Sequence, residues 1–360
     1  MMEVGLEPND MNESDSSEEA KLPMALFTVE HSSKKRLLFD VSSRELRGVS
    51  SSAFPHATCA FENGGWLLIL QQKPPDFNQQ AVFLVHPSTA RQLDLPPLSS
   101  SNDGLFVFYV NSHGAPLVAA RIETLSFVPT VHIACPGDVY WSVYSYKQHD
   151  TDVDPPACTS RAAQSGFLGK IPEPVSIVDV ALLGTQAVCL DANGEIIVFD
   201  ITEMTWRRRM PVVSPDSGFR QYTRSLVAAD GEVLLVSRPR TMENTFRFFK
   251  LDMEALEWSP LERRELDDAS WFLCKGQSFR AKEAGKRRVY TFDGPEQCGS
   301  KAEASVVGRS LGQGMYLKSI ANVYAYDLDD GSFEMVIPES IITEARHWAR
   351  PNVFASTPAT

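Results

Sequence analysis

Adjacent carboxylates are the residues of this chain whose spacing most directly suggests chemistry. They occur at Asp267-Asp268 and at Asp329-Asp330. Two carboxylates that flank a sugar can hydrolyse a glycosidic bond, so paired acids at one central pocket would indicate a glycosidase. Both pairs, however, fall in predicted turns, where acidic side chains normally face solvent and bond to nearby backbone. We therefore interpret them as turn residues.

Phosphate, nucleophile and metal chemistry lack complete motifs. The Gly-rich segment 308–314 has no Gly-Lys-Ser/Thr to hold phosphates. Ser165-Gly166 and Ser217-Gly218 lack the flanking residues of a nucleophile elbow. The seven histidines, at positions 31, 56, 86, 113, 132, 149 and 347, show no metal-ligand spacing. We predict no catalytic, cofactor-binding or metal-binding residue, no cofactor and no enzymatic activity.

Three short basic clusters stand out. They are Lys34-Lys35-Arg36, Arg207-Arg208-Arg209 and Lys286-Arg287-Arg288, and each flanks a predicted strand. A basic cluster can act as a nuclear import signal. It can equally charge the edge of a strand and discourage pairing with another chain. We favour the second interpretation.

The charge of the chain is concentrated at one end. Residues 1–20 carry seven acids and no base, which leaves only −5 of the net charge of −12 for the remaining residues. An acidic total gives no support to nucleic-acid binding. The longest strongly apolar run, 66–70, is too short to span a bilayer, and no secretory signal opens the chain. We expect no membrane association and a location in the cytoplasm, the nucleus or both.

Composition separates an acidic tail from a folded body. Residues 1–22 are acidic, Ser-rich and poor in aromatic residues, so we predict that they are disordered. The six cysteines, at positions 59, 135, 158, 189, 274 and 298, form no Cys-x-x-Cys pair. We expect reduced, structural thiols, with Cys189 buried in an apolar strand.

A weak internal repeat organises the body of the chain. Five apolar runs end in Asp or His, and a long or apolar side chain follows six positions later. The pairs are Asp40 with Leu46, His86 with Gln92, Asp200 with Trp206, Asp252 with Trp258, and Asp327 with Phe333. An Asp at the end of a strand can bond backbone two residues on and close a turn. Each copy therefore predicts a hairpin, and we expect these Asp residues to be structural rather than catalytic.

The spacing of the hairpins predicts the fold. Successive copies lie 46, 114, 52 and 75 residues apart, and the interval of 114 hides a degenerate copy near 105–110 or 134–146. Such periods are typical of propeller blades. We predict an all-β fold in which residues 23–357 form a single β-propeller of six four-stranded blades, with seven as the alternative. A strand near Val353 is expected to pair with the first unit and close the ring.

Several segments resemble a plant family. Residues 83–98 (FLVHPSTARQLDLPPL), 231–238 (GEVLLVSR) followed by 246–252 (FRFFKLD), 270–279 (SWFLCKGQSF) and 323–332 (VYAYDLDDGS) carry the likeness. Over residues 36–355 the chain resembles the plant F-box-associated domain of unknown function 295 family (DUF295), which is related to kelch-like propellers. This resemblance implies a propeller that binds protein rather than one that catalyses a reaction.

Members of that family carry an F-box, which docks onto the Skp adaptor of an SCF ubiquitin ligase, while the propeller presents the substrate. No F-box is recognisable here, so a stand-alone scaffold or a competitor for the same partner is expected. The partner would bind loops on one face of the ring, such as 147–170 and 294–314. The alternative is a carbohydrate-active or small-molecule-binding propeller enzyme, which requires carboxylates that converge on a central pocket.

Overall fold

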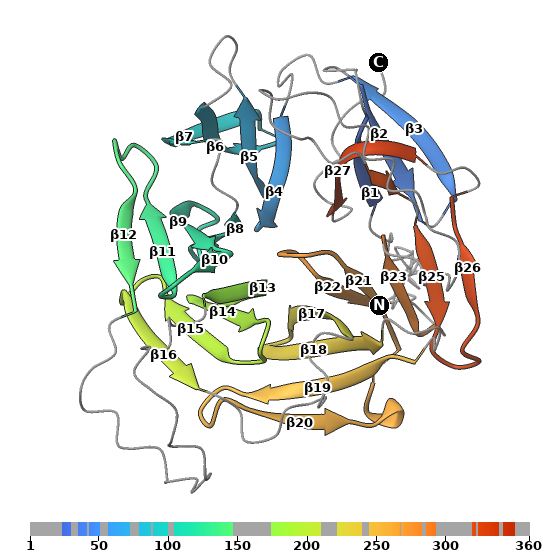
Figure 1. Cartoon of the computed structure of the whole chain (residues 1–360). Coiled ribbons are helices and arrows are strands. Elements are labelled where there is room, and N and C mark those ends of the chain that lie inside the picture. Colours follow the sequence, from blue (N-terminus) through green and yellow to red (C-terminus); the bar gives the residue numbers. More distant parts are fainter. Residues whose placement is uncertain are drawn as a thin grey trace, which may run out of the picture.

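The computed structural model describes residues 24–29, 35–41, 43–50, 57–72, 79–87, 89–99, 104–146, 174–209, 222–239, 245–266, 268–282, 286–292, 319–321, 323–337 and 341–349. These residues form strands, together with one short 3₁₀ helix, η2 (Arg263–Glu265). The strands assemble into six sheets that stand around a common centre (Figure 1). The predicted all-β propeller is confirmed.

Five of the sheets, which we call blades I to V, follow one another along the chain. Blade I contains β4 (Ala57–Asn63), β5 (Trp66–Gln72), β6 (Gln79–His86) and β7 (Arg91–Ser99). Blade II contains β8 (Gly104–Val110), β9 (Pro116–Glu123), β11 (Thr130–Ala134) and β12 (Ser142–Ser145). Blade III contains β13 (Val175–Leu183), β14 (Gln186–Asp191), β15 (Ile196–Asp200) and β16 (Thr205–Arg209), with β10 (Leu125–Ser126) beside β13.

The remaining two blades complete this series. Blade IV contains β17 (Tyr222–Ala229), β18 (Glu232–Pro239), β19 (Arg247–Asp252) and β20 (Glu257–Leu261). Blade V contains β21 (Ala269–Leu273), β22 (Phe279–Lys282), β23 (Arg288–Thr291), β25 (Tyr324–Asp327) and β26 (Phe333–Met335). Blade V departs from the regular pattern because β21 and β23 pair in parallel.

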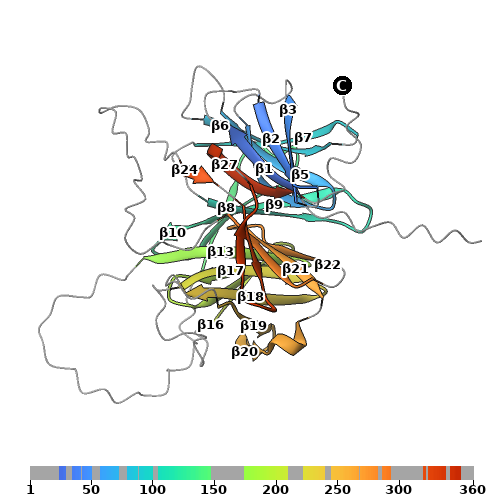
Figure 2. The ribbon, with the colours of Figure 1, turned by 90° about the vertical axis from the view of Figure 1, so that its right-hand side faces the viewer.

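The sixth sheet, which we call the closing sheet, joins the two ends of the described chain. It has the order β24 (Ser319–Ala321), β27 (Ile341–Ala349), β1 (Met24–Val29), β2 (Lys35–Asp40) and β3 (Glu45–Ser50). Strands β1 and β27 are antiparallel, with Met24 opposite Ala349, and they lie together in both views (Figures 1 and 2). Because β27 closes the ring, the closing strand precedes Val353, which lies outside the described residues.

The predicted hairpins are confirmed as the outer two strands of the sheets. They are β2–β3, β6–β7, β15–β16, β19–β20 and β25–β26. The degenerate copy is the hairpin β11–β12, which overlaps the expected range 134–146 and begins four residues before it, whereas residues 105–110 belong to the inner strand β8. The Asp-to-aromatic spacing therefore marks the periphery of the ring.

Hydrogen bonds explain why Asp recurs at the end of these strands. Asp252 Oδ1 accepts hydrogen bonds from the N–H groups of Glu254 (2.8 Å) and Ala255 (2.9 Å). Asp200 Oδ1 accepts in the same way from Thr202 and Glu203, both at 3.0 Å. The Ala255 and Glu254 N–H groups hold the pKa of Asp252 below its usual value. The carboxylate thus folds the turn back on itself, as an Asx turn does.

These turns share a second feature that the sequence repeat did not reveal. The fourth residue after the Asp or His has a left-handed backbone in all five predicted hairpins, with φ of 56° at Arg44, 53° at Ala90, 56° at Met204, 51° at Leu256 and 74° at Gly331. Only glycine adopts this conformation without a steric penalty. Four of the five turns therefore carry a strained residue.

The core lies between neighbouring sheets. Phe61 of blade I meets Phe108 of blade II edge to face, with ring centroids 5.6 Å apart. Tyr144 of blade II similarly approaches Phe199 of blade III, at 6.0 Å. Cys189 is 1% exposed, as expected for a structural thiol, and the cysteines at 59, 135, 189 and 274 are free. Aromatic contacts between blades fix the angle between adjacent sheets.

Exchanging residues at the left-handed turn position should change stability in opposite directions. Ala90→Gly removes backbone strain at an exposed site and should raise the free energy of unfolding by about 0.5–1 kcal/mol. Gly331→Ala introduces the same strain, with no atom within 4 Å of the new Cβ, and should lower it by about 1 kcal/mol. Urea denaturation followed by circular dichroism measures both. Equal stability of all three proteins would contradict the strain assigned to this position.

Candidate functional site

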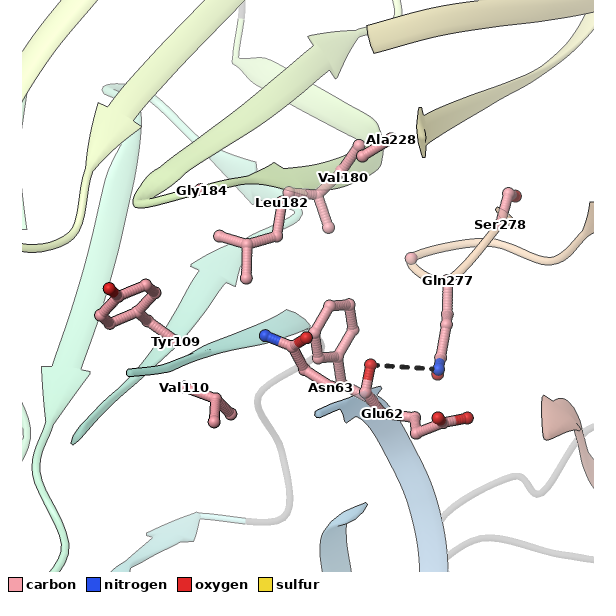
Figure 3. Close-up of a pocket in the computed structure, with 13 residues that line it drawn as sticks. Glu62, Asn63, Tyr109, Val110, Val180, Leu182, Gly184, Ala228, Gln277 and Ser278 are labelled. Atoms are coloured by element: carbon pink, nitrogen blue, oxygen red, sulfur yellow. Dashed lines mark hydrogen bonds between the residues drawn. The ribbon is translucent and has the colours of Figure 1, made fainter. Parts of the chain in front are cut away.

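A pocket lies at the centre of the ring, where the inner strands of five blades turn. Its volume is about 240 Å³. Asn63 of blade I, Tyr109 of blade II, Leu182 of blade III, Ala228 of blade IV and Gln277 of blade V line it (Figure 3). We call it the central pocket. Because every described blade contributes to it, only the assembled ring creates this site.

The walls of the central pocket are apolar at one side and polar at the other. Phe61 and Val180 are buried and line it beside Leu182. Asn63 donates a hydrogen bond from Nδ2 to the carbonyl oxygen of Phe108 (2.9 Å), so its Oδ1 remains an acceptor. The pocket therefore combines apolar surface with a few polar groups, an arrangement typical of sites for small organic molecules.

Gln277 is the most unusual polar residue of the pocket. Its side chain comes from the β21–β22 turn and is only 6% exposed. It extends toward Glu62, and Nε2 donates to the Glu62 carbonyl oxygen at 3.5 Å (Figure 3). Its Oε1 atom is buried and has no hydrogen-bond partner within the part of the chain that the structure describes. A buried acceptor without a donor is costly, and such groups often mark a ligand or water position.

A buried carboxylate next to the pocket ties three blades together. Asp179, in β13 of blade III, is 1% exposed. Its Oδ1 accepts hydrogen bonds from the N–H groups of Val180 (2.9 Å) and Gly276 (2.6 Å), and its Oδ2 accepts one from Leu226 (2.7 Å). Leu226 belongs to blade IV, and Gly276 precedes Gln277 in blade V. Asp179 therefore fixes the turn that carries Gln277.

The environment of Asp179 changes its acidity. Burial raises its pKa from 3.8 to about 7, and hydrogen bonds from Gly276, Leu226 and Val180 and the charge of Lys275 only partly oppose this shift. An acid whose pKa is higher in the folded chain binds more protons when folded. The free energy of unfolding should therefore fall as pH rises from about 4 to about 7, because the folded carboxyl resists ionisation.

The carboxylate pairs considered from the sequence do not meet at the central pocket. Asp329 lies in the turn between β25 and β26, where it forms an ion pair with Arg287. Asp330 in the same turn accepts a hydrogen bond from the Ser332 N–H (2.7 Å). Asp268 is exposed just before β21, and Asp267 lies outside the described residues. The described members of both pairs are turn acids, as their positions predicted.

Two of the basic clusters form ion pairs and edge contacts, whereas Lys34 of the first cluster lies outside the described residues. Arg207 of the outer strand β16 donates to the carbonyl oxygens of Met253 and Glu254 in blade IV, and Arg208 pairs with Glu195. Arg288 approaches Asp327 (3.6 Å) and Glu334 (3.9 Å). These contacts support the interpretation of charged sheet edges.

The histidine and cysteine side chains form no metal-binding cluster within the described ranges. No group of three His, Cys, Asp or Glu side chains there is arranged to hold a metal ion. His132 pairs with Glu123 (2.7 Å), and the ring of His86 packs edge to face on Trp66 (5.2 Å). Among the described residues, no helix has the length and apolarity needed to cross a membrane.

Several other predicted features lie outside the described residues. They are the tail 1–22, the loops 147–170 and 294–314, the Gly-rich segment 308–314, Ser165, Ser217, Cys158 and Cys298. The sequence analysis missed Gln277 and Asp179. A charged residue within the apolar run 177–183 was a signal for Asp179. Nothing local distinguished Gln277 from an ordinary turn residue.

Comparison with known protein families identifies the propeller. The model described as "KIB1-4 beta-propeller" matches residues 38–307, which is most of the chain. The chain belongs to the KIB1-4 beta-propeller family. This is a plant F-box-associated family of propellers, so that part of the resemblance is confirmed, whereas the assignment to the domain of unknown function 295 family stays a prediction. Blades I to IV, the first three strands of blade V and β3 of the closing sheet fall within the matched KIB1-4 region.

Solved structures resemble this KIB1-4 propeller only distantly. The β-propeller domain of Cps50 (Swd1) from Myceliophteria thermophila has 10% identity and a TM-score of 0.42, over 89% of this chain and 87% of that one. KlAtg21, in complex with the coiled coil of AgAtg16, has 9% identity and a TM-score of 0.36, over 67% of each chain. A putative 6-phosphogluconolactonase from Bacteroides fragilis has 11% identity and a TM-score of 0.35, over 93% and 99%.

With TM-scores below 0.5, none of these likenesses bears on what this chain does. A search of curated protein sequences finds no match.

Replacing Asp179 by Asn should remove the pH dependence described above. The carboxamide does not titrate. The free energy of unfolding of the variant should therefore rise relative to that of wild type by about 1.4 kcal/mol for each unit of pH increase in the range below pH 7. Urea denaturation at pH 5, 6, 7 and 8 measures this difference. The exposed Asp268→Asn variant is the control and should follow wild type. Parallel pH profiles for Asp179→Asn and wild type would show that the buried carboxyl does not titrate in this range.

Proposed function

We propose that this KIB1-4 propeller is a non-catalytic protein-interaction module, of the kind that recognises substrates for plant SCF ubiquitin ligases. The F-box association of the family supports this proposal, as does the resemblance to the domain of unknown function 295 family. We further infer that the closing sheet serves as a sixth blade. The module would act in the cytoplasm, the nucleus or both, with a protein partner and without nucleic acid, membrane or cofactor.

One surface carries the proposal. The β11–β12 hairpin of blade II exposes three apolar side chains, which we call the hairpin patch: Val139 is 70% exposed, Tyr140 81% and Val143 58%. Exposed apolar side chains that cluster on one element are typical of interaction sites, whereas single ones are ordinary. Tyr is also enriched among residues that dominate binding energy.

The hairpin patch departs from the other outer hairpins. Elsewhere four or five residues connect the strands, for example between Asp200 and Thr205, but residues 135–141 form a longer turn here. The Cys135 N–H donates to Asp138 Oδ2 (2.7 Å), which holds the turn in shape. Val139 and Tyr140 follow directly. The extra residues therefore present apolar side chains where the repeat normally has a compact polar turn.

The outermost strand of blade II is also open to a partner. Strand β12 (Ser142–Ser145) contains no charged residue, unlike β16 with its arginines. Uncharged edge strands readily accept another strand, since nothing repels an incoming backbone. Val143 points outward from this edge, whereas Tyr144 is half-buried against blade III. The hairpin patch could thus combine side-chain contacts with backbone pairing.

The hairpin patch and the central pocket lie on the same face of the ring. Strands β8, β9, β11 and β12 are antiparallel neighbours, so the β8–β9 and β11–β12 turns share one end of the blade. Val110, at the β8–β9 turn, lines the pocket. A protein held by the hairpin would therefore extend over the pocket side.

A carbohydrate-active enzyme receives less support. That alternative requires paired carboxylates that are free to act at the central pocket. The described members of the predicted pairs lie in other turns, and of the two buried acids at the pocket, Glu62 and Asp179, the second already accepts three backbone hydrogen bonds.

Substituting the hairpin patch should abolish partner binding. The variant Val139→Ser/Tyr140→Ser removes the apolar anchors without touching the core, and it should reduce recovery of the specific partner from plant extract at least tenfold. Quantitative mass spectrometry after affinity capture measures this. Met335→Ser, which alters an exposed apolar residue of blade V, is the control and should bind like wild type.

The same experiment separates the two forms of the proposal. Recovery of the Skp adaptor together with the partner indicates a ligase receptor, and recovery of the partner alone indicates a scaffold or competitor. If the double variant and wild type capture the same proteins in equal amounts, the hairpin patch is not the binding surface.

A further inference from the structure

We propose that the central pocket binds a small, neutral organic molecule whose hydrogen-bond donor meets Oε1 of Gln277. This is a second binding function, and it does not depend on the protein partner proposed above. The site is enclosed by residues of five blades, whereas the hairpin patch belongs to blade II alone.

The geometry of Gln277 indicates that the ligand carries a hydrogen-bond donor. Nε2 already donates to the Glu62 carbonyl oxygen (3.5 Å), and that acceptor fixes which way the carboxamide is turned. A flip would bring Oε1 against the carbonyl oxygen and leave two acceptors face to face. Oε1 is therefore held as a buried acceptor, with no partner among the described residues. A hydroxyl or N–H donor on a ligand would satisfy it.

The turn that carries Gln277 is held in place before any ligand arrives. The Gln277 N–H bonds to the Cys274 carbonyl oxygen (3.0 Å). The preceding Gly276, with a left-handed φ of 79°, donates to the buried Asp179 carboxyl group. Ser278 accepts from the Cys274 N–H (3.0 Å) and donates to its carbonyl oxygen (2.9 Å). A preformed acceptor binds a ligand with little loss of conformational entropy.

The charge around the pocket selects a neutral molecule. The polar groups that face it include the acceptors Asn63 Oδ1 and Gln277 Oε1; the buried acid Glu62 also lines the pocket, and the buried acid Asp179 lies beside it. An anion would be repelled by this arrangement. A cation would lose part of its hydration on entry, and both acids already interact within the protein, Asp179 by accepting three backbone hydrogen bonds. Neither charge is favoured, so a neutral donor fits best.

Size and shape point to a flat or compact ligand. A volume of about 240 Å³ is below the usual range of about 300–1,000 Å³ for pockets that hold drug-sized molecules. Phe61, Val180 and Leu182 offer apolar contact to the body of the ligand. A small ring with one donor matches both features.

Indole and benzofuran test the proposal as a matched pair. They have the same size and shape, but only indole carries an N–H donor. With the full-length protein, ligand-observed NMR titration should show saturable binding of both, with indole binding about tenfold more tightly because it satisfies Oε1. Absence of saturable binding, or equal affinity of the two probes, would overturn the proposal and leave a water-filled channel mouth.

Variants locate the binding. Gln277→Leu should lower the affinity for indole to that for benzofuran and leave benzofuran unchanged. Ala228→Phe fills the pocket and should abolish binding of both probes. Gln92→Leu, which changes an exposed glutamine of β7 that bonds to Asp94, should bind both like wild type. If Ala228→Phe retains full affinity, the probes bind elsewhere and the assignment is wrong.

Folding of the variants is checked by near-ultraviolet circular dichroism. Should Gln277→Leu fail to fold, the side-chain amide resonances of Gln277 in the wild-type protein provide the second measurement. They should shift on addition of indole and much less on addition of benzofuran. Identical shifts with both probes would refute a hydrogen bond to Oε1.

Discussion

The ring depends on one buried carboxyl group at its centre. Asp179 accepts backbone N–H groups from its own strand, from β17 and from the β21–β22 turn, so a single side chain holds three blades in register. Blades of a propeller otherwise meet mainly through apolar side chains, which tolerate small rotations. Hydrogen bonds to one acceptor do not tolerate such rotations, because the strength of a hydrogen bond falls steeply as its angle departs from linear. The position of the central pocket follows from this constraint.

Local hydrogen bonds hold the turns at the periphery of the ring, whereas residues far apart in the sequence meet at its centre. This difference decides which features could be predicted from the sequence. The outer hairpins depend on contacts between residues that are close in sequence. Asp252 and the residues that bond to it lie within three positions, so the pattern can be recognised in the sequence. The pocket is non-local, because Gln277 and its acceptor at Glu62 come from opposite ends of the described blades. No spacing rule connects such residues, and only the closed ring brings them together.

The same contrast between local and long-range contacts explains why three features of the sheets were not predicted correctly from the sequence. The blade II hairpin lacks the Asp or His that ends the strand in the others, so only the interval between its neighbours indicated it. Parallel pairing of β21 with β23 has no signature in a short apolar run, since alternation looks the same in both directions. The closing strand was expected near Val353, but β27 at Ile341–Ala349 has this role. Strand existence was predictable here, whereas partner and register were not.

The closing sheet also determines when, during synthesis of the chain, the ring can close. Strands β1 and β2 are synthesised first, yet the inner edge of β1 stays unpaired until β27 has been made. Blades I to V can form as they emerge, since their contacts lie mostly within each blade. The nascent chain therefore carries an open strand edge until β27 has been made. During that time, the same pairing that finally seals the ring exposes the protein to association with other chains.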